Sequence, residues 1–178
     1  MQYHKIKIAG LQRELPLCAV SDTLSIAAFI MTGDVEMTIA AAKELLKKVP
    51  EFDVILTPET KSIPLAYEMA RQSGKTYVVA RKSVKVYMRE PVFVELQSIT
   101  TANIQKLYIG KDDINILSGK RVLLVDDVIS TGESLIALKK ICKMAGGNIA
   151  ASCAVLAEGD AANRTDIIFL EPLPLFYK

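Results

Sequence analysis

The chain has 178 residues, of which 51% are apolar and 24% charged, and its formal net charge is +2. This length suits one domain with a full core, and the near-neutral charge gives no bulk electrostatic reason to expect a nucleic-acid or membrane partner. No apolar run is long enough to span a membrane, and the first residues do not indicate a signal peptide. The three cysteines lie far apart without metal-ligand spacing, which favours core residues in a reducing cytoplasm. Because the only histidine, His4, lies near the N-terminus, histidine triads and multi-histidine metal sites are excluded.

From residue 34 onward, helical periods and short apolar runs alternate. The helical segments carry local signals, such as Thr32 or Asp34 as a cap for the first and Gly74 at the end of the second. The short apolar runs are typical of buried strands. The predicted helices are residues 34–49, 63–73 and 133–145, and the predicted strands are residues 52–57, 76–80, 121–125 and 148–156. This alternation predicts an α/β fold in which a parallel sheet is flanked by helices.

The pattern changes between residues 81 and 119. Residues 91–96 and 106–109 resemble two strands, and polar residues around 100–103 predict a turn between them. We expect a long, partly flexible hairpin over about residues 82–110, inserted into a single domain of residues 1–178. Long insertions in compact domains are often lids.

One segment, residues 121–134, indicates a chemical role. An apolar strand is followed by Asp126 and Asp127, then by a short loop containing Thr131-Gly132, and then by a helix. Ligands of open parallel sheets bind beyond the carboxyl ends of strands, and N–H groups at a helix N-terminus favour an anion. Backbone N–H groups of residues 130–134 can therefore hold a phosphate, while the two carboxylates accept hydrogen bonds from vicinal hydroxyls. A phosphate and a diol held side by side describe a ribose 5-phosphate.

The acid pair allows two other interpretations. Paired acids after a strand also bind magnesium in P-loop proteins, but no Gly-x-x-x-x-Gly-Lys-Ser/Thr occurs in this chain. A solvated Asp-Asp turn beside a helix cap is the plainer alternative. The joint occurrence of strand, acid pair, Thr-Gly and helix favours the sugar phosphate site.

The segment resembles the phosphoribosyl pyrophosphate signature of type I phosphoribosyltransferases. The resemblance implies that Asp126 and Asp127 bind the ribose hydroxyls at the catalytic centre. It also implies that the 5-phosphate lies on Ser130, Thr131, Gly132, Glu133 and Ser134. Many purine members have Thr-Gly-Gly-Thr where this chain has Thr-Gly-Glu-Ser, so the Glu133 carboxylate is tolerable only if it points outward.

Two further loops resemble the family. Where adenine phosphoribosyltransferases carry Glu-Ala-Arg-Gly, this chain has Glu59, Thr60, Lys61 and Ser62, which implies a pyrophosphate-binding loop with lysine in place of arginine. Arg81, Lys82 and Lys85 match the Arg-Lys-x-x-Lys of adenine members, and we expect them to stabilise the leaving pyrophosphate, with Lys85 catalytic. Taken alone, Lys61 could be a surface lysine and residues 81–85 a solvated charge run.

Three features of the sequence bear on which base such an enzyme would use. The stretch from residue 98 to 109 looks more like xanthine enzymes, whereas residues 173–176 look more like adenine enzymes. Where xanthine enzymes carry a base-contacting lysine, this chain has Gly159 after Glu158. The family also reads the base partly through a small N-terminal hood, here about residues 1–33, and this region matches no member closely.

The resemblance implies a purine phosphoribosyltransferase of purine salvage, with adenine the expected base. It joins the base to phosphoribosyl pyrophosphate and releases pyrophosphate. Mg²⁺ is expected to be held mainly by substrate and water, with no direct protein ligand, in a cytoplasmic homodimer. Two alternatives stay open: a non-catalytic regulator of the same fold that senses phosphoribosyl pyrophosphate or nucleotide, and a transferase specific for xanthine, hypoxanthine or a pyrimidine.

Overall fold

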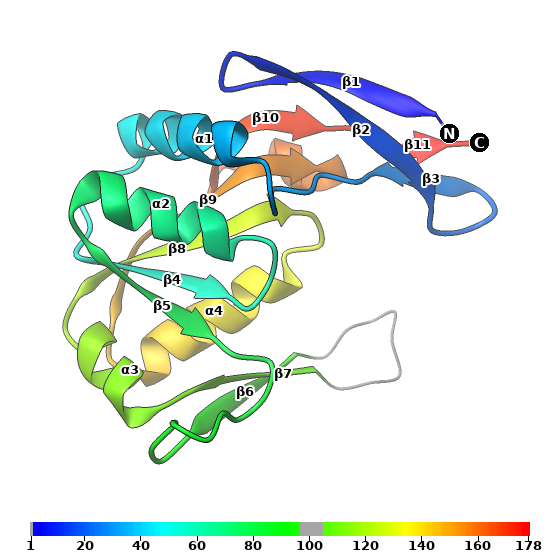
Figure 1. Cartoon of the computed structure of the whole chain (residues 1–178). Coiled ribbons are helices and arrows are strands. Elements are labelled where there is room, and N and C mark those ends of the chain that lie inside the picture. The colour runs from blue at the N-terminus through cyan, green and yellow to red at the C-terminus, as the bar shows by residue number, and fades with distance from the viewer. Residues whose placement is uncertain (1, 97–104) are drawn as a thin grey trace.

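The computed structural model describes residues 2–96 and 105–178, and its core is a five-stranded sheet with the strand order β10-β9-β8-β4-β5 (Figure 1). All four neighbouring pairs in this sheet are parallel, which confirms the predicted fold class. The strands are β4 (Val54–Pro58), β5 (Thr76–Ala80), β8 (Arg121–Ile129), β9 (Asn148–Glu158) and β10 (Ile168–Leu173). The last of these was not predicted, and β8 continues four residues beyond its predicted end at Val125.

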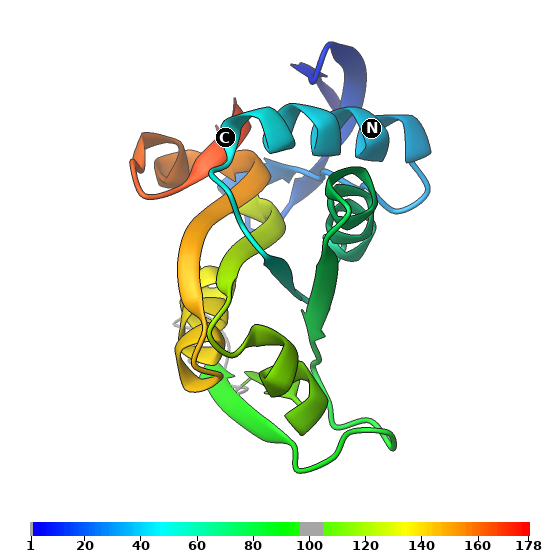
Figure 2. The ribbon, with the colours of Figure 1, turned by 90° about the vertical axis from the view of Figure 1, so that its left-hand side faces the viewer.

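Helices cover both faces of this sheet (Figures 1 and 2). On one face lie α1 (Val35–Lys48) and α2 (Ile63–Ser73), and on the other lie α3 (Lys111–Leu117) and α4 (Glu133–Met144). Asp34 caps α1 as predicted, since its Oδ1 accepts a hydrogen bond from the Met37 N–H at 3.1 Å. Each face of the sheet carries one cluster of buried apolar residues. Alternate β4 residues point to opposite faces, so Ile55 belongs to the cluster with α1 and α2, and Leu56 belongs to the cluster with α4. None of the helices formed by residues 2–96 and 105–178 is long and apolar enough to cross a membrane.

The strand order reverses between β4 and β8. From β4 the chain continues to β5 on one side, and from β8 it continues to β9 on the other. The loops that leave β4 and β8 therefore diverge, and a ligand-binding crevice is expected at the carboxyl ends of these two strands. The predicted pyrophosphate loop and the predicted phosphate loop both begin at this crevice.

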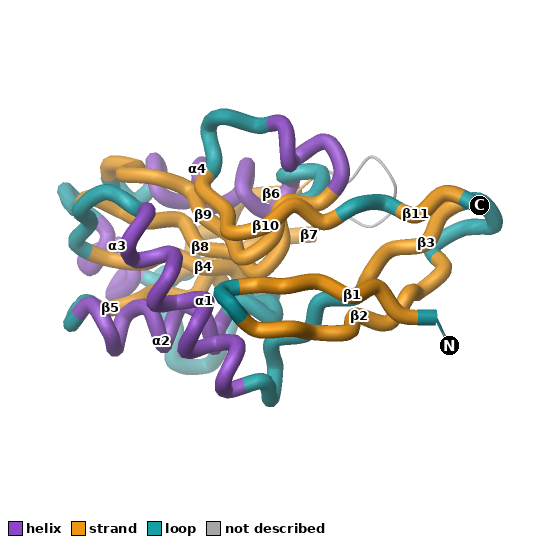
Figure 3. The backbone as a smooth tube through the Cα atoms, turned by 90° about the horizontal axis from the view of Figure 1, so that it is seen from above, coloured by secondary structure: helices purple, strands orange, loops and turns teal. Residues whose placement is uncertain are grey.

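The hood is a four-stranded antiparallel sheet beyond the carboxyl edge of the main sheet (Figure 3). Its order is β1 (Tyr3–Ile8), β2 (Leu11–Ala19), β3 (Leu24–Ala27) and β11 (Phe176–Tyr177). The predicted hood of residues 1–33 omitted β11, which pairs with β3 through Phe176 and Ser25. This pairing adds the C-terminal strand to the hood, and buried Ile8 and Phe29 pack the hood against the hydrophobic cluster that contains α1 and α2.

The predicted hairpin is present as β6 (Val92–Leu96) and β7 (Gln105–Ile109), an antiparallel pair on the face that carries α4. Arg81 and Tyr108 exchange backbone hydrogen bonds of 2.8 and 2.7 Å, and Leu107 and Ile109 are buried, so the base of the hairpin is anchored. The predicted turn at residues 100–103 lies outside the described residues, and the flexibility of the hairpin stays a prediction. In Figure 1 the hood and this hairpin lie on opposite sides of the strand ends.

The cysteines are all free thiols. Burial raises the pKa of Cys142 to about 11 and that of Cys153 to about 12, so both are inert core residues, as predicted. Cys18 in the hood is only partly buried.

Candidate functional site

The two predicted carboxylates lie near the end of β8 and are almost completely buried, Asp126 being 7% and Asp127 4% exposed. Both fall within the strand rather than beyond it, because β8 continues to Ile129 and pairs there with β9. Asp126 Oδ1 accepts hydrogen bonds from the Asp127 N–H at 2.9 Å and from Thr60 Oγ1 at 3.3 Å. The pair is therefore held rigidly at the floor of the crevice between β4 and β8.

The loop after β4 crosses this crevice and contacts the acid pair. Lys61 Nζ lies 3.2 Å from Asp127 Oδ2 and donates a hydrogen bond of 2.8 Å to the Phe29 carbonyl in the segment that follows β3. Lys61 thus joins the predicted pyrophosphate loop, the acid pair and the hood region. The role of Phe29 was not predicted, because a backbone carbonyl leaves no signature in a sequence.

Asp127 Oδ2 is a buried acceptor that lacks a hydrogen-bond donor within the described part of the chain. Lys61 is close enough to form an ion pair, but its N–H groups do not meet this oxygen with hydrogen-bond geometry. A buried carboxylate oxygen without a donor costs about 1–3 kcal/mol or more. A ligand hydroxyl that enters the crevice would remove this cost, which is what a ribose-binding carboxylate requires.

Burial, together with the neighbouring Asp127 carboxylate, raises the pKa of Asp126 well above its ordinary value. The Asp126 carboxyl therefore resists ionisation in the free protein. Donors or a cation brought by a ligand favour its ionised form.

The predicted phosphate loop connects β8 to α4 and surrounds a small cavity of about 110 Å³. Gly132 has φ of +83°, a left-handed conformation that a residue with a side chain rarely adopts. Glu133 lines the same cavity, so this loop adds a third carboxylate to the acid pair and the outward orientation expected of it stays a prediction. The lining residues are Asp126, Val128, Ile129, Ser130, Thr131, Gly132, Glu133, Ser134 and Leu135.

The predicted cations gather around Glu59. Its Oε1 accepts a hydrogen bond from Arg81 Nη1 at 3.1 Å and lies 3.5 Å from Lys85 Nζ, and its Oε2 accepts from the Lys82 N–H at 2.7 Å. The Lys82 N–H, followed by Arg81, lowers the pKa of the Glu59 carboxyl. Two segments about 20 residues apart in sequence are therefore joined through Glu59. We call Lys61, Arg81, Lys82 and Lys85 the cationic rim, and their role in binding pyrophosphate stays a prediction.

Ser62 has a different place from the one predicted. Its side chain is fully buried, and its hydroxyl oxygen lies 2.7 Å from both Thr57 Oγ1 and Thr60 Oγ1, with one hydrogen bond to each. Thr57 Oγ1 in turn donates to the Val125 carbonyl at 2.9 Å. The Ser62 hydroxyl therefore shapes the loop and ties it to β8, rather than facing a ligand.

The end of β9 leaves no room for a side chain at residue 159. Gly159 has φ of +58°, and a Cβ built on it would lie 2.9 Å from Leu175 Cδ1. Glu158, the preceding residue, is 9% exposed and ends the strand at the same edge of the sheet. A lysine at 159 would strain the backbone and displace the C-terminal segment.

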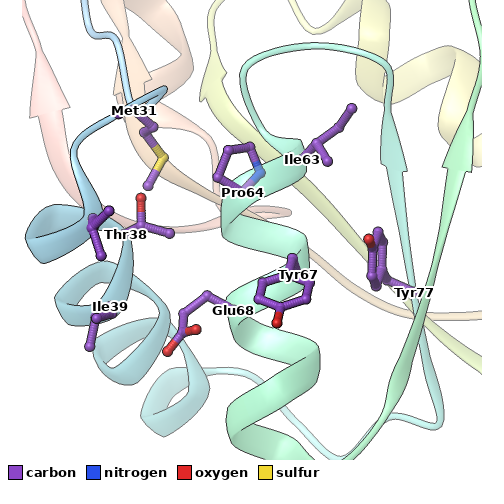
Figure 4. Close-up of a pocket in the computed structure, with 10 residues that line it drawn as sticks. Met31, Thr38, Ile39, Ile63, Pro64, Tyr67, Glu68 and Tyr77 are labelled. Carbon is purple, nitrogen blue, oxygen red and sulfur yellow. The ribbon is translucent and has the colours of Figure 1, made fainter.

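A larger cavity of about 440 Å³ lies between α1 and α2 (Figure 4). Most of its walls are apolar, with Met31, Ile39 and Tyr67 among them, and Glu68 is already paired with Arg71 at 2.7 Å. None of the predicted site residues lines it. The crevice at the acid pair, not this groove, has the groups that a sugar phosphate needs.

Comparison with known proteins gives a consistent picture. Residues 35–171 match the family profile described as phosphoribosyl transferase domain. The adenine phosphoribosyltransferase of Thermotoga neapolitana is 36% identical over 101 residues, which cover 57% of this chain and 56% of that protein. The hypoxanthine/guanine phosphoribosyltransferase of Methanosarcina barkeri is also 36% identical, over 127 residues that cover 71% of this chain and 62% of that protein. These aligned segments span less than two thirds of either relative.

Solved structures agree on the fold. The crystal structure of adenine phosphoribosyltransferase from Thermoanaerobacter pseudethanolicus has a TM-score of 0.69 at 21% identity, covering 96% of this chain and 95% of that one. The Saccharomyces cerevisiae enzyme, complexed with an imino-altritol bisphosphate and adenine, has a TM-score of 0.65 at 20% identity, covering 95% and 92%.

The acid pair can be tested by replacing both carboxylates. Asp126→Asn with Asp127→Asn should weaken phosphoribosyl pyrophosphate binding by about 100-fold or more, because each hydrogen bond to a charged group contributes about 1.5–3 kcal/mol. Calorimetry measures the affinity, and circular dichroism checks the fold. A variant with Asp22→Asn and Glu51→Gln removes two exposed carboxylates and should bind normally. Unchanged affinity in the acid-pair variant would sink the site assignment.

The acid pair should also reduce stability at neutral and alkaline pH. Between the ordinary pKa of Asp126, about 3.8, and its raised value, the folded state binds more protons than the unfolded chain, so stability falls as the pH rises. Asp126→Asn cannot ionise and keeps an Oδ1 acceptor, so its gain in Tm over the wild type should grow with pH. Asp53→Asn should lose Tm at neutral pH, because Arg121 lowers the pKa of that carboxyl. A pH-independent effect of Asp126→Asn would contradict this explanation.

Proposed function

The chain belongs to the phosphoribosyl transferase domain family, and we propose that it is a purine phosphoribosyltransferase with adenine as its preferred base. The observation that carries the proposal is the contact of Thr60 and Lys61 with Asp126 and Asp127 across the crevice. It brings a cationic loop, suited to a pyrophosphate, next to an acid pair suited to a ribose. The reaction breaks the bond from the anomeric carbon to pyrophosphate and forms one from that carbon to a purine ring nitrogen.

The residues around the crevice match the charges that develop in this reaction. The ribose gains positive charge as the bond to pyrophosphate breaks, and Asp126 and Asp127 can stabilise it while accepting hydrogen bonds from its hydroxyls. The leaving pyrophosphate gains negative charge, which the cationic rim can stabilise. Its members are Lys61, Arg81, Lys82 and Lys85. The 5-phosphate, held by the loop of residues 130–134, fixes the anomeric carbon between these two regions.

We propose Mg²⁺ as the cofactor, held mainly by substrate and water. No cluster of three or more histidine, cysteine or acidic side chains occurs among residues 2–96 and 105–178. Asp127 Oδ2, which accepts no hydrogen bond within the described residues, is a hard oxygen atom close to where such a substrate-held cation would lie. When bound with the substrate, Mg²⁺ would offset the negative charge of the leaving pyrophosphate.

Adenine is proposed because the groups that read a 6-oxo base have no counterpart at Gly159. Its left-handed backbone and the contact with Leu175 oppose a lysine there. The amino group of adenine can instead be read by backbone carbonyls. Relatives of comparable identity include both adenine and hypoxanthine/guanine enzymes, so the base is the finer part of the proposal.

We also propose a cytoplasmic homodimer. The groove between α1 and α2 is the surface that supports a second copy, since Val35, Ile39 and Tyr67 are 68%, 44% and 54% exposed beside it. Exposed apolar side chains gathered in one groove are typical of an interface.

A panel of bases tests the proposed reaction. With phosphoribosyl pyrophosphate and Mg²⁺, pyrophosphate release should be fastest with adenine. The kcat/KM for hypoxanthine, guanine and xanthine should be about 100-fold or more below that for adenine, because a site that hydrogen-bonds one substrate group rejects bases lacking it. A higher kcat/KM with an oxo base would overturn adenine alone. No turnover with any base would favour a regulator that senses phosphoribosyl pyrophosphate.

The role of Lys85 can be separated from general attraction. Lys85→Ala should lower kcat by about 10-fold or more while leaving the affinity for the nucleotide product nearly unchanged, because the leaving group is absent from that product. Lys75→Ala removes an exposed lysine next to the start of β5, at the opposite end of the strand, and should change neither quantity. Equal losses of kcat and product affinity would show that Lys85 only attracts anions.

A further inference from the structure

The loop that is proposed to hold the 5-phosphate has an unfavourable charge. Residues 126–135 include three carboxylates and no lysine or arginine. A phosphate monoester brings about 1.5 to 2 further negative charges at neutral pH. The N-terminus of α4 offsets only about half a charge. Lys61 already pairs with Asp127, and a further cation close to this loop would favour a phosphate there.

Arg164 is such a cation. It follows the short 3₁₀ helix η1 (Gly159–Asn163), and its N–H donates to the Ala161 carbonyl at 3.1 Å. Its guanidinium lies against Gly132, because a Cβ built on that glycine would be 2.6 Å from Arg164 Nη1. Gly132 therefore serves two purposes: it adopts a left-handed backbone, and it lets a cation approach the phosphate loop closely.

The guanidinium is held in place by Asp166. Arg164 Nε and Nη2 donate to the two Asp166 oxygens, both at 2.8 Å, which is the forked geometry of a strong pair. Lys139 on α4 also donates to Asp166, at 3.0 Å. These three side chains together carry one net positive charge, so Asp166 does not cancel the cation. Nη1, the nitrogen next to Gly132, takes no part in this fork.

We propose that Arg164 is a ligand of the 5-phosphate, oriented by Asp166 and directed through Nη1 at the loop of residues 130–134. This inference rests on the proposed function, because it needs a sugar phosphate in that loop. Neither the signature segment nor the cationic rim includes this arginine, which lies about 30 residues after Gly132. Its position there depends on η1 returning the chain to the end of β8 and the start of α4.

Two probes that do not depend on the identity of the base test the proposal. The first is calorimetric titration of the wild type, Arg164→Ala and Arg164→Lys with ribose 5-phosphate. The affinity should fall by about 10- to 100-fold in Arg164→Ala and by less in Arg164→Lys. The affinities for magnesium pyrophosphate should agree within about 2-fold for all three proteins, because Arg164 lies at the phosphate loop and not at the cationic rim. Lys140→Ala removes an equal charge from an exposed position on α4 and should bind both probes like the wild type.

Asp166→Asn keeps Arg164 and removes the charged partner that orients it, so it should weaken ribose 5-phosphate binding relative to the wild type and leave magnesium pyrophosphate binding unchanged. This variant keeps the test decisive if the alanine variant unfolds. Equal affinity for ribose 5-phosphate in the wild type and Arg164→Ala would overturn the inference. An equal loss for both probes would also overturn it, since Arg164 would then only support the fold. Failure of the wild type to bind ribose 5-phosphate would instead overturn the proposed function.

Discussion

The acid pair at the reversal of strand order is the feature around which the crevice is built. Asp126 and Asp127 are almost entirely removed from water, and one of their oxygens has no hydrogen-bond donor in the described structure. Such burial opposes folding unless neighbouring groups compensate for it. Thr60 and Lys61 provide part of this compensation, and a bound diol would provide the remainder. The site is therefore prepared for its ligand at the expense of stability.

Three separate parts of the chain meet because the buried acid pair needs neighbouring groups to compensate for its burial. Lys61 contacts Asp127 and the Phe29 carbonyl, so the loop after β4 is joined to β8 and to the segment after the hood. Glu59, in the same loop, gathers the cations that follow β5. The parallel sheet makes these contacts possible, since the carboxyl ends of all its strands lie at one edge. Negative charge therefore lies at the acid pair, and positive charge lies on Lys61 and on the cations around Glu59.

The sequence predicted what local signals determine. The bounds of α2 and β5 agree with their predicted ranges, because Pro64 and Gly74 mark the ends of the helix. The pairing of β11 with β3 joins residues about 150 positions apart, and a two-residue strand has no periodicity to read. The chemical roles expected of the acid pair and the cations rest on a motif and stay predictions. The inward position of Ser62, the Phe29 carbonyl and the approach of Arg164 to Gly132 depend on tertiary packing, which no local pattern records.

A crystal structure with ribose 5-phosphate bound would test the central claim most directly. The account predicts the ribose hydroxyls within hydrogen-bond distance of the acid pair, one of them donating to Asp127 Oδ2, and the phosphate on the loop of residues 130–134. A sugar phosphate bound elsewhere, with Asp127 Oδ2 still lacking a donor, would contradict it.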